Sequence, residues 1–136
     1  PDRRLQLPTL QVCLTPADLQ SWQQSLIDVQ LSDAVLDYIQ RLIQFTRQSP
    51  RIQLGLSPRG GLAIVRAARC YALMDGRKYV TPDDVQAVFS AVANHRLSGS
   101  DAMVDALAVT DQPSDRDQLQ ENLAQWVLAS VNVLSE

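Results

Sequence analysis

The chain has 136 residues, of which 46% are hydrophobic and 20% are charged, so it is about one globular domain in size and can bury a core. Its net charge of -3 and isoelectric point near 5.0 exclude a general basic surface, and with it nucleic acid or an anionic membrane as the main partner. Two cysteines and one histidine form neither a disulfide framework nor a metal site. No apolar run could span a bilayer and no signal peptide pattern is present, so we expect a cytoplasmic protein.

The first predicted helix runs from about Pro16 to Val29, because Thr15 is a good helix cap and Pro16 a favoured first helical residue. Leu19, Trp22, Leu26 and Val29 follow one another at spacings of three and four, which is typical of a buried helix face. We therefore expect Trp22 in the core.

A second helix is predicted to start after Ser32 and to run to about Gln48, where Ser49 and Pro50 end it. We expect it to be central, because its apolar face is broad. That face comprises Val35, Leu36, Ile39, Leu42, Ile43 and Phe45.

The third predicted helix extends from Pro58 to about Asp75, and Gly76 is its expected C-cap. Its expected packing residues are Leu62, Val65, Ala68, Ala72 and Leu73.

A fourth helix is predicted from Pro82 to about Asn94, and His95 and Arg96 place cations at its negative end. Its expected buried residues are Val85, Val88, Phe89 and Val92.

Residues 98–115 are predicted to be a loosely packed connection, since they combine Ser-Gly-Ser, several aspartates and a proline. A last helix is expected from about Asp115 to Leu134, anchored by Trp126. Its apolar side comprises Leu119, Leu123, Trp126, Val127, Ser130, Val131 and Leu134. Strands should be absent or limited to short extended stretches at 6–13 and around Tyr79, so the predicted fold class is all-α, a small bundle of four to five helices.

Three helix starts share one pattern, a Ser or Thr cap followed by proline, but they differ in charge. The starts at Thr15 and Thr81 carry acids in the first turn, whereas the start at Ser57 carries Arg59. A cation is unfavourable there, because the helix dipole and the unpaired N–H groups are positive. A phosphate could accept hydrogen bonds from Arg59 and these N–H groups, with Gly60 and Gly61 leaving space for it. The alternative is an arginine that bends out into solvent.

Isolated catalysis is not supported by the sequence. None of the five glycines belongs to a phosphate loop ending in Lys and Ser or Thr. Asp83 and Asp84 are interpreted as helix-start charges rather than as an acid–base pair. His95 has no nucleophile motif near it. Arg66 and Arg69 extend a basic edge from Arg59 along the third helix, which could face a phosphate, an acidic subunit or solvent.

Six segments, in their order and spacing, resemble the C-terminal lid of MoxR-type AAA+ ATPases. They are Leu31–Ile39, Phe45–Arg47, Gly55–Arg59, Arg66–Ala68, Gly76–Val85 and Asn94–Leu97. The resemblance covers about residues 8 to 97, and the tail matches only in ending with a short helix. It implies a domain division into an extended linker from a missing ATPase core at 1–12, a helical lid domain at 13–97, and a connection with a C-terminal helix packed on the lid at 98–136.

The resemblance also implies a role for Arg59. It corresponds to the sensor 2 arginine, which contacts the terminal phosphate of ATP and tilts the lid on hydrolysis, with Ser57, Pro58 and Gly60 around the nucleotide. Gly60 departs from the family, which often has alanine there. Tyr38 and Ile39 are left out of the site, because core packing explains them equally well.

For the full-length parent, the resemblance implies ATP hydrolysis with ATP and magnesium as cofactors. The fragment alone would be no enzyme, because it lacks the Walker A and Walker B motifs. Expected partners are the preceding AAA+ core domain, neighbouring subunits of a hexamer and a von Willebrand factor A domain protein, in a chaperone-like role that matures or activates protein complexes. No metal is expected in the chain itself.

Two other functions remain to be compared with the lid. One is a helical adaptor without nucleotide binding, in which Arg59 contacts an acidic partner. The other is a histone-like nucleic-acid binder, suggested by Thr81–Val85, which fails because the chain has no basic surface.

Overall fold

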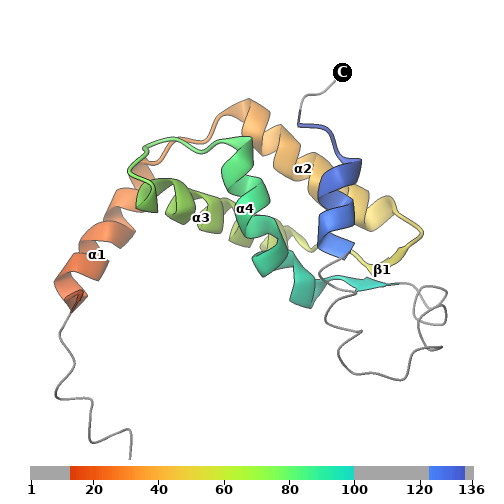
Figure 1. Ribbon diagram of the computed structural model, residues 1–136, viewed down its shortest axis with the longest axis horizontal. Coiled ribbons are helices and arrows are strands. Elements are labelled where there is room, and N and C mark those ends of the chain that lie inside the picture. Colours follow the sequence, from red (N-terminus) through yellow and green to blue (C-terminus); the bar gives the residue numbers. More distant parts are fainter. Residues whose placement is uncertain (1–12, 100–122, 134–136) are drawn as a thin grey trace, which may run out of the picture.

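The computed structural model describes residues 13–99 and 123–133 (Figure 1). Helices dominate, which confirms the predicted all-α class. The elements in chain order are α1 (Pro16–Ser25), η2 (Leu26–Asp28), α2 (Asp33–Gln48), β1 (Ile52–Leu54), α3 (Pro58–Met74), α4 (Pro82–Ala93), η3 (Asn94–Arg96), β2 (Ser98–Gly99) and a C-terminal helix at 123–130. The predicted linker at 1–12, most of the connection at 98–115 and the predicted helix start at Asp115 lie outside the described residues.

The helix starts follow the caps that the sequence predicts. Thr15, Ser32, Ser57 and Thr81 are the N-cap residues of α1, α2, α3 and α4, and each accepts a hydrogen bond from a first-turn N–H. At the end of α3, Gly76 adopts a positive φ of 75°. Its N–H donates to the carbonyl of Leu73, and the N–H of Arg77 donates to the carbonyl of Ala72. These two hydrogen bonds are the pair that defines a Schellman motif.

Two short strands were not expected. β1 and β2 pair antiparallel, with Ile52 opposite Gly99. A strand of three residues is too short to show alternation, and its partner lies far along the chain, so the sequence carries no local signal for the pair. The extended stretch predicted around Tyr79 is present as a parallel bridge to Gln30.

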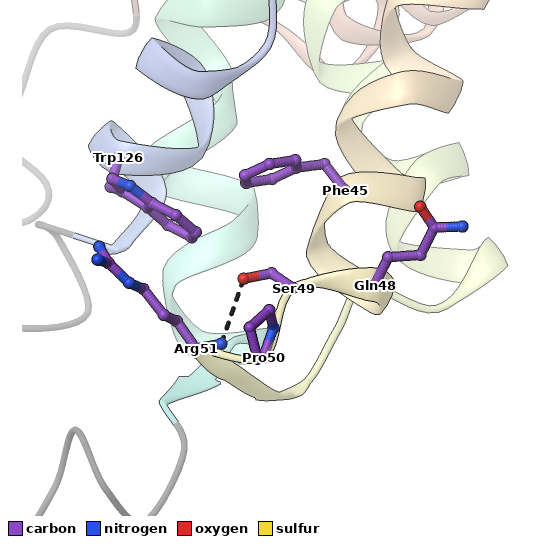
Figure 2. A pocket seen from close by; sticks show the side chains of 6 residues that line it. All are labelled: Phe45, Gln48, Ser49, Pro50, Arg51 and Trp126. Carbon is purple, nitrogen blue, oxygen red and sulfur yellow. Dashed lines mark hydrogen bonds between the residues drawn. The ribbon is translucent and has the colours of Figure 1, made fainter.

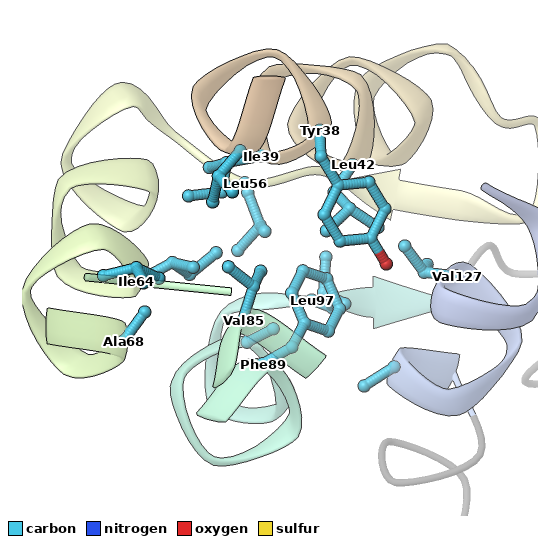
Figure 3. Packing of buried hydrophobic residues seen from close by; sticks show 14 of the residues in the cluster. Tyr38, Ile39, Leu42, Leu56, Ile64, Ala68, Val85, Phe89, Leu97 and Val127 are labelled. Carbon is cyan, nitrogen blue, oxygen red and sulfur yellow. The ribbon is translucent and has the colours of Figure 1, made fainter. Parts of the chain in front are cut away.

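The core lies between α2, α3 and α4 (Figure 3). Tyr38 and Leu42 from α2, Ile64 from α3 and Phe89 from α4 are fully buried around Leu56, which precedes α3. The C-terminal helix adds the buried side chains of Leu123, Ala124 and Val127 to the same cluster.

Trp126 anchors the C-terminal helix to α2, as predicted. Its ring lies 5.1 Å from that of Phe45 between centroids. One turn earlier in α2, the guanidinium of Arg41 donates to the carbonyls of Asn132 and Val133, at 2.5 and 2.8 Å. These bonds fix the end of the helix, although Ser130 on its predicted apolar side is exposed.

The prediction that Trp22 belongs to the core is wrong. Trp22 is 51% exposed, Leu19 is 48% exposed, and α1 contains no buried residue. The reason is tertiary, since α1 projects away from the bundle and the chain reaches the core only beyond it, at Val29 (Figure 1).

Two other expected packing residues are also exposed. Leu62 lies 200° around α3 from the buried Ile64, on the outer side of the helix, and is 62% exposed. Leu36 is exposed on α2, which buries Tyr38 and Thr46 instead. In both helices the buried face is narrower than the apolar pattern suggests. Single exposed leucines of this kind are common in folded domains.

Among the helices of the described ranges, none combines the length and the apolar content that a membrane-spanning helix requires.

Candidate functional site at the start of helix α3

The end of α2 holds the loop that leads into α3. The buried hydroxyl of Thr46 accepts a hydrogen bond from the N–H of Leu56 at 3.0 Å and donates to the carbonyl of Ile43 at 2.7 Å. The Nε of Arg47 donates to the carbonyl of Leu56 at 2.7 Å. Both backbone groups of Leu56 are therefore fixed by neighbouring residues of α2, and this determines where the first turn of α3 begins.

Gly55 allows this close approach. A Cβ atom at Gly55 would lie 2.6 Å from the carbonyl oxygen of Thr46, which is backbone and cannot move aside. The segments Phe45–Arg47 and Gly55–Arg59 thus contact each other directly. Both segments belong to the family resemblance in the sequence, and that pattern is the only signal in the sequence for the positioning role of Thr46 and Arg47.

Arg59 occupies the first turn of α3, as predicted. Ser57 is the cap, its hydroxyl accepts from the N–H of Gly60 at 3.2 Å, and Pro58 is the first helical residue. The side chain of Arg59 is exposed, and within the described ranges it makes no hydrogen bond or salt bridge. It is a cation at the positive end of a helix, held on a rigid element and unpaired by the rest of the described fold.

The start of α3 differs from those of α1 and α4 at the third helical position. At that position in α1 and α4, the carboxylates of Asp18 and Asp84 fold back and accept a hydrogen bond from the backbone N–H of the cap residue. The caps are Thr15 and Thr81, and the bonds are 2.9 and 2.8 Å long.

In α3 the third position is Gly60, which has no such carboxylate. Within the described part of the chain, the N–H of Ser57 therefore has no acceptor. The N–H of Arg59 is one of the first-turn groups that lack an acceptor within the helix. The start of α3 lacks the anion that the other two starts provide for themselves.

Gly60 and Gly61 are buried and face the interior of the bundle. A Cβ at Gly60 would make ordinary contacts with Leu56 and with the Cδ of Arg96, whereas one at Gly61 would lie 2.5 Å from the Cδ1 of Ile43. Only at Gly61 does the missing side chain make room for packing, against Ile43. Both glycines are buried, which differs from the expectation that they clear space for an anion.

The basic edge of α3 divides into two environments. Arg66 is exposed, whereas Arg69 is partly buried and its Nε has no hydrogen-bond partner in the described structure. Arg96, from η3, is also partly buried with an unpartnered Nε, and it lies against Gly60 at the first turn of α3. The cationic end predicted for α4 therefore lies close to the start of α3.

The acid pair at the start of α4 has a structural role. Asp84 is 2% exposed and accepts two hydrogen bonds from the guanidinium of Arg77, at 2.8 and 2.6 Å. Arg77 also donates to Asp75 at 3.0 Å, so it links the end of α3 to the start of α4. The Arg77 guanidinium holds the pKa of the Asp84 carboxyl below its usual value, and the two carboxylates, Asp84 first, raise the pKa of Arg77. This explains Asp84 without acid–base chemistry, and Asp83 beside it is an exposed acid in the first turn of the helix.

Tyr38 is part of the core. Its side chain is fully buried and its hydroxyl accepts a hydrogen bond from the amide of Gln86 at 3.2 Å. The described residues also contain no group of three His, Cys, Asp or Glu side chains arranged to hold a metal ion.

A hollow of about 480 Å³ lies elsewhere, at the end of α2 (Figure 2). It is lined by Phe45, Gln48, Ser49, Pro50, Arg51 and Trp126. The guanidinium of Arg51 lies 5.1 Å from the centroid of the Trp126 ring, so a cation–π contact forms one wall. None of the residues at 57–60 lines this hollow.

The described helical bundle agrees with the class that the family comparison shows, a lid domain of the AAA+ type. A family model described as AAA lid domain matches residues 44–122, and the chain belongs to this family. Its relatives place it with the MoxR type.

Two curated relatives cover most of this chain. It is 38% identical over 91 residues to the YeaC protein of Bacillus subtilis, covering 67% of this chain and 28% of that protein. It is 33% identical over 111 residues to the chaperone MoxR1 of Mycobacterium tuberculosis, covering 74% and 29%. A 46-residue stretch is 48% identical to the MoxR protein of Methylorubrum extorquens, covering 34% of this chain and 13% of that protein. The chain therefore spans less than a third of the length of the curated relatives it matches.

The fold agrees with a solved structure. A crystal structure of a candidate ATPase from Cytophaga hutchinsonii superposes with a TM-score of 0.69 at 20% identity, covering 88% of this chain and 36% of that one. This likeness supports the lid fold.

Proposed function

We propose that this chain is the nucleotide-sensing lid of a MoxR-like AAA+ ATPase, in which Arg59 contacts the terminal phosphate. The observation that carries the proposal is the open start of α3. Arg59 is exposed and unpaired within the described residues, and the N–H of Ser57 lacks the carboxylate that Thr15 and Thr81 each have. A phosphate oxygen would supply the missing acceptor and the missing negative charge.

The residues at the site fit a nucleotide phosphate. In the parent, ATP with magnesium would supply the transferable terminal phosphate. Arg59 would hold that phosphate, and Ser57, Pro58 and Gly60 would shape the turn that presents it. The hydroxyl of Ser57 accepts a hydrogen bond from the N–H of Gly60. The backbone N–H of Ser57 is available to an acceptor from outside the turn.

The sensing step follows from the rigidity of this turn. Thr46 and Arg47 fix Leu56, and Leu56 directly precedes the cap of α3. A change of charge at Arg59 therefore acts on α3 as a whole, and α3 shares its core with α2 and α4. On hydrolysis, Arg59 would lose its contact with the terminal phosphate, and the lid would then move as one rigid body.

The proposal extends to the parent protein. The parent would hydrolyse ATP in the cytoplasm and associate, through a preceding AAA+ core, with the neighbouring subunits of a hexamer. It would act with a von Willebrand factor A domain partner in a chaperone-like role, the maturation of complexes. This part of the proposal is supported by the family match and by the name of MoxR1 as a chaperone. The adaptor alternative has no comparable support, because the AAA lid model matches residues 44–122.

The test is steady-state ATP hydrolysis by the full-length parent, comparing wild type with Arg59→Ala and Arg66→Ala. Arg66 is a matched control, since it is an exposed arginine on the same helix, seven residues farther on. We expect Arg59→Ala to lower turnover by about 100-fold, as for other groups that stabilise developing charge, and Arg66→Ala to change it little. Unchanged turnover of Arg59→Ala with the assembly intact would contradict the proposal.

A second variant tests the same turn in the opposite direction. Gly60→Asp places at α3 the carboxylate that α1 and α4 carry, and the space at Gly60 accepts a Cβ. Its carboxylate would accept the N–H of Ser57 and repel a phosphate, so we expect lower turnover without loss of folding. Full activity of Gly60→Asp would show that no anion binds at this turn.

A further inference from the structure

Helix α1 is formed although it buries none of its side chains against the rest of the described structure. It has 10 residues, none of them buried, and it projects from the bundle (Figure 1). Isolated helices shorter than about 12–15 residues are marginal in water, because the cost of nucleation is recovered only over several turns. The capping box of Thr15 and Asp18 contributes about 1 kcal/mol, which does not change that balance. A stable α1 therefore needs a covering surface.

The exposed side chains of this segment are apolar. Leu19 and Trp22 lie three residues apart on one side of α1, with Leu14 before the helix and Ile27, 80% exposed, after it. We use the name α1 face for these four exposed residues together, of which Leu19 and Trp22 share one side of the helix. Tryptophan is enriched among the residues that carry most of the binding energy of protein interfaces.

The α1 face carries almost no charge. Asp18 is the only charged residue of α1, and its carboxylate is engaged by the backbone and hydroxyl of Thr15. An anionic or basic partner would find no complementary group here. The surface that covers it is therefore apolar, and the contact depends little on salt.

From these observations we infer that the α1 face docks on the nucleotide-binding domain of the same polypeptide. The identity of that domain rests on the proposed function. The match covers only 28% and 29% of the two relatives, so most of their length lies outside it. A parent protein of that size would have other parts that could cover α1. Four side chains bury much less than the roughly 800 Å² per partner of a stable complex, which disfavours a second copy as the occupant. A covalently attached domain needs no such area, since its effective concentration is high.

Docking at α1 would give the lid two separate connections to the rest of the subunit. The α1 face would attach one end through apolar contacts, whereas Arg59 would attach α3 through the phosphate. Between them lie η2 and the bridge of Gln30 to Tyr79, which join α1 to the bundle. The α1 face and Arg59 would thus hold the lid at two separate places, joined by this hydrogen-bonded segment.

The test is amide hydrogen exchange of α1 in the full-length parent and in the 136-residue chain, both without nucleotide. We expect exchange in α1 to be at least about tenfold slower in the parent, because docking adds protection that the isolated chain lacks. Equal exchange rates in the two proteins would overturn the inference. Slow exchange in the 136-residue chain that depends on its concentration would identify a second copy as the occupant instead.

Variants of the parent locate the contact. Leu19→Ala and Trp22→Ala should restore fast exchange in α1, whereas Leu54→Ala should not, since Leu54 is an exposed leucine that lies on β1 instead. Protection that survives both α1 variants would rule out the α1 face as the contact. Because these measurements need neither nucleotide nor turnover, they separate a failure of docking from a failure of the phosphate sensor.

Discussion

Helices α1 and α4 begin in the same way and end in opposite environments. Both start with Thr, Pro and an aspartate at the third position, and both form a complete capping box with nearly equal bond lengths. Yet α1 buries none of its residues, whereas α4 buries Asp84, Val85, Phe89 and Ala93. A capping signal thus determines where a helix begins, and says nothing of whether the helix belongs to the core.

The largest expected difference between the two helices concerns their aromatic residues. Phe89→Ala should lower the free energy of unfolding of the 136-residue chain by about 3–5 kcal/mol, because the ring is fully buried among α2, α3 and α4. Trp22→Ala should change it by less than about 0.5 kcal/mol, as an exposed residue. Urea denaturation followed by circular dichroism measures both, and a large effect of Trp22→Ala would mean that α1 packs on the bundle in solution.

The two capping aspartates should differ next. Asp84→Ala should cost about 3 kcal/mol, because it leaves the guanidinium of Arg77 without its buried partner. Asp18→Ala should leave the denaturation midpoint unchanged, since α1 does not take part in the cooperative unfolding of the bundle. If both variants shift the midpoint equally, the role assigned to the Arg77–Asp84 pair is wrong.

The pH dependence separates the same pair of residues. The pKa of Asp84 is lowered in the folded chain by Arg77, and that of Asp18 by its hydrogen bonds to Thr15. A lowered pKa stabilises the fold above the unfolded value, near pH 4, and this contribution is lost as the pH falls through the folded value. Below about pH 4, wild type should lose stability more steeply than Asp84→Ala, while Asp18→Ala should parallel wild type. Acid titrations of the three chains test this, and parallel curves for wild type and Asp84→Ala would contradict it.

The smallest expected effect concerns the third start of this kind, at α3. Gly60→Ala should stabilise the chain by about 0.4–1 kcal/mol, since its backbone is helical and the new Cβ makes ordinary contacts. Gly61→Ala is the matched control, because its Cβ would displace Ile43 and should remove the gain. Thermal unfolding of both variants measures the difference. Destabilisation by Gly60→Ala would show that Arg96 or Leu56 cannot adjust.

The site was predictable from the sequence in part. Arg59 stood out by charge alone, because it occupies a helix start where the related starts have acids. The contacts of Thr46 and Arg47 to Leu56 could not be read in this way, since they join residues 9 and 10 positions apart through a loop whose path is a tertiary property. The unpartnered Nε of Arg96 beside Gly60 is a further example, since η3 and α3 meet only in the folded bundle.

Local chemistry determined the helix boundaries, because caps such as Ser57, the proline that follows each start discussed here, and Gly76 act within one turn of the chain. The sequence also identified the family and the one misplaced cation. Only the tertiary structure decided which apolar faces are buried: Trp22 and Leu62 have the spacing of core residues but lie on the outside. The physical reason is that burial depends on where whole helices pack against one another, and a residue's own helix does not contain that information.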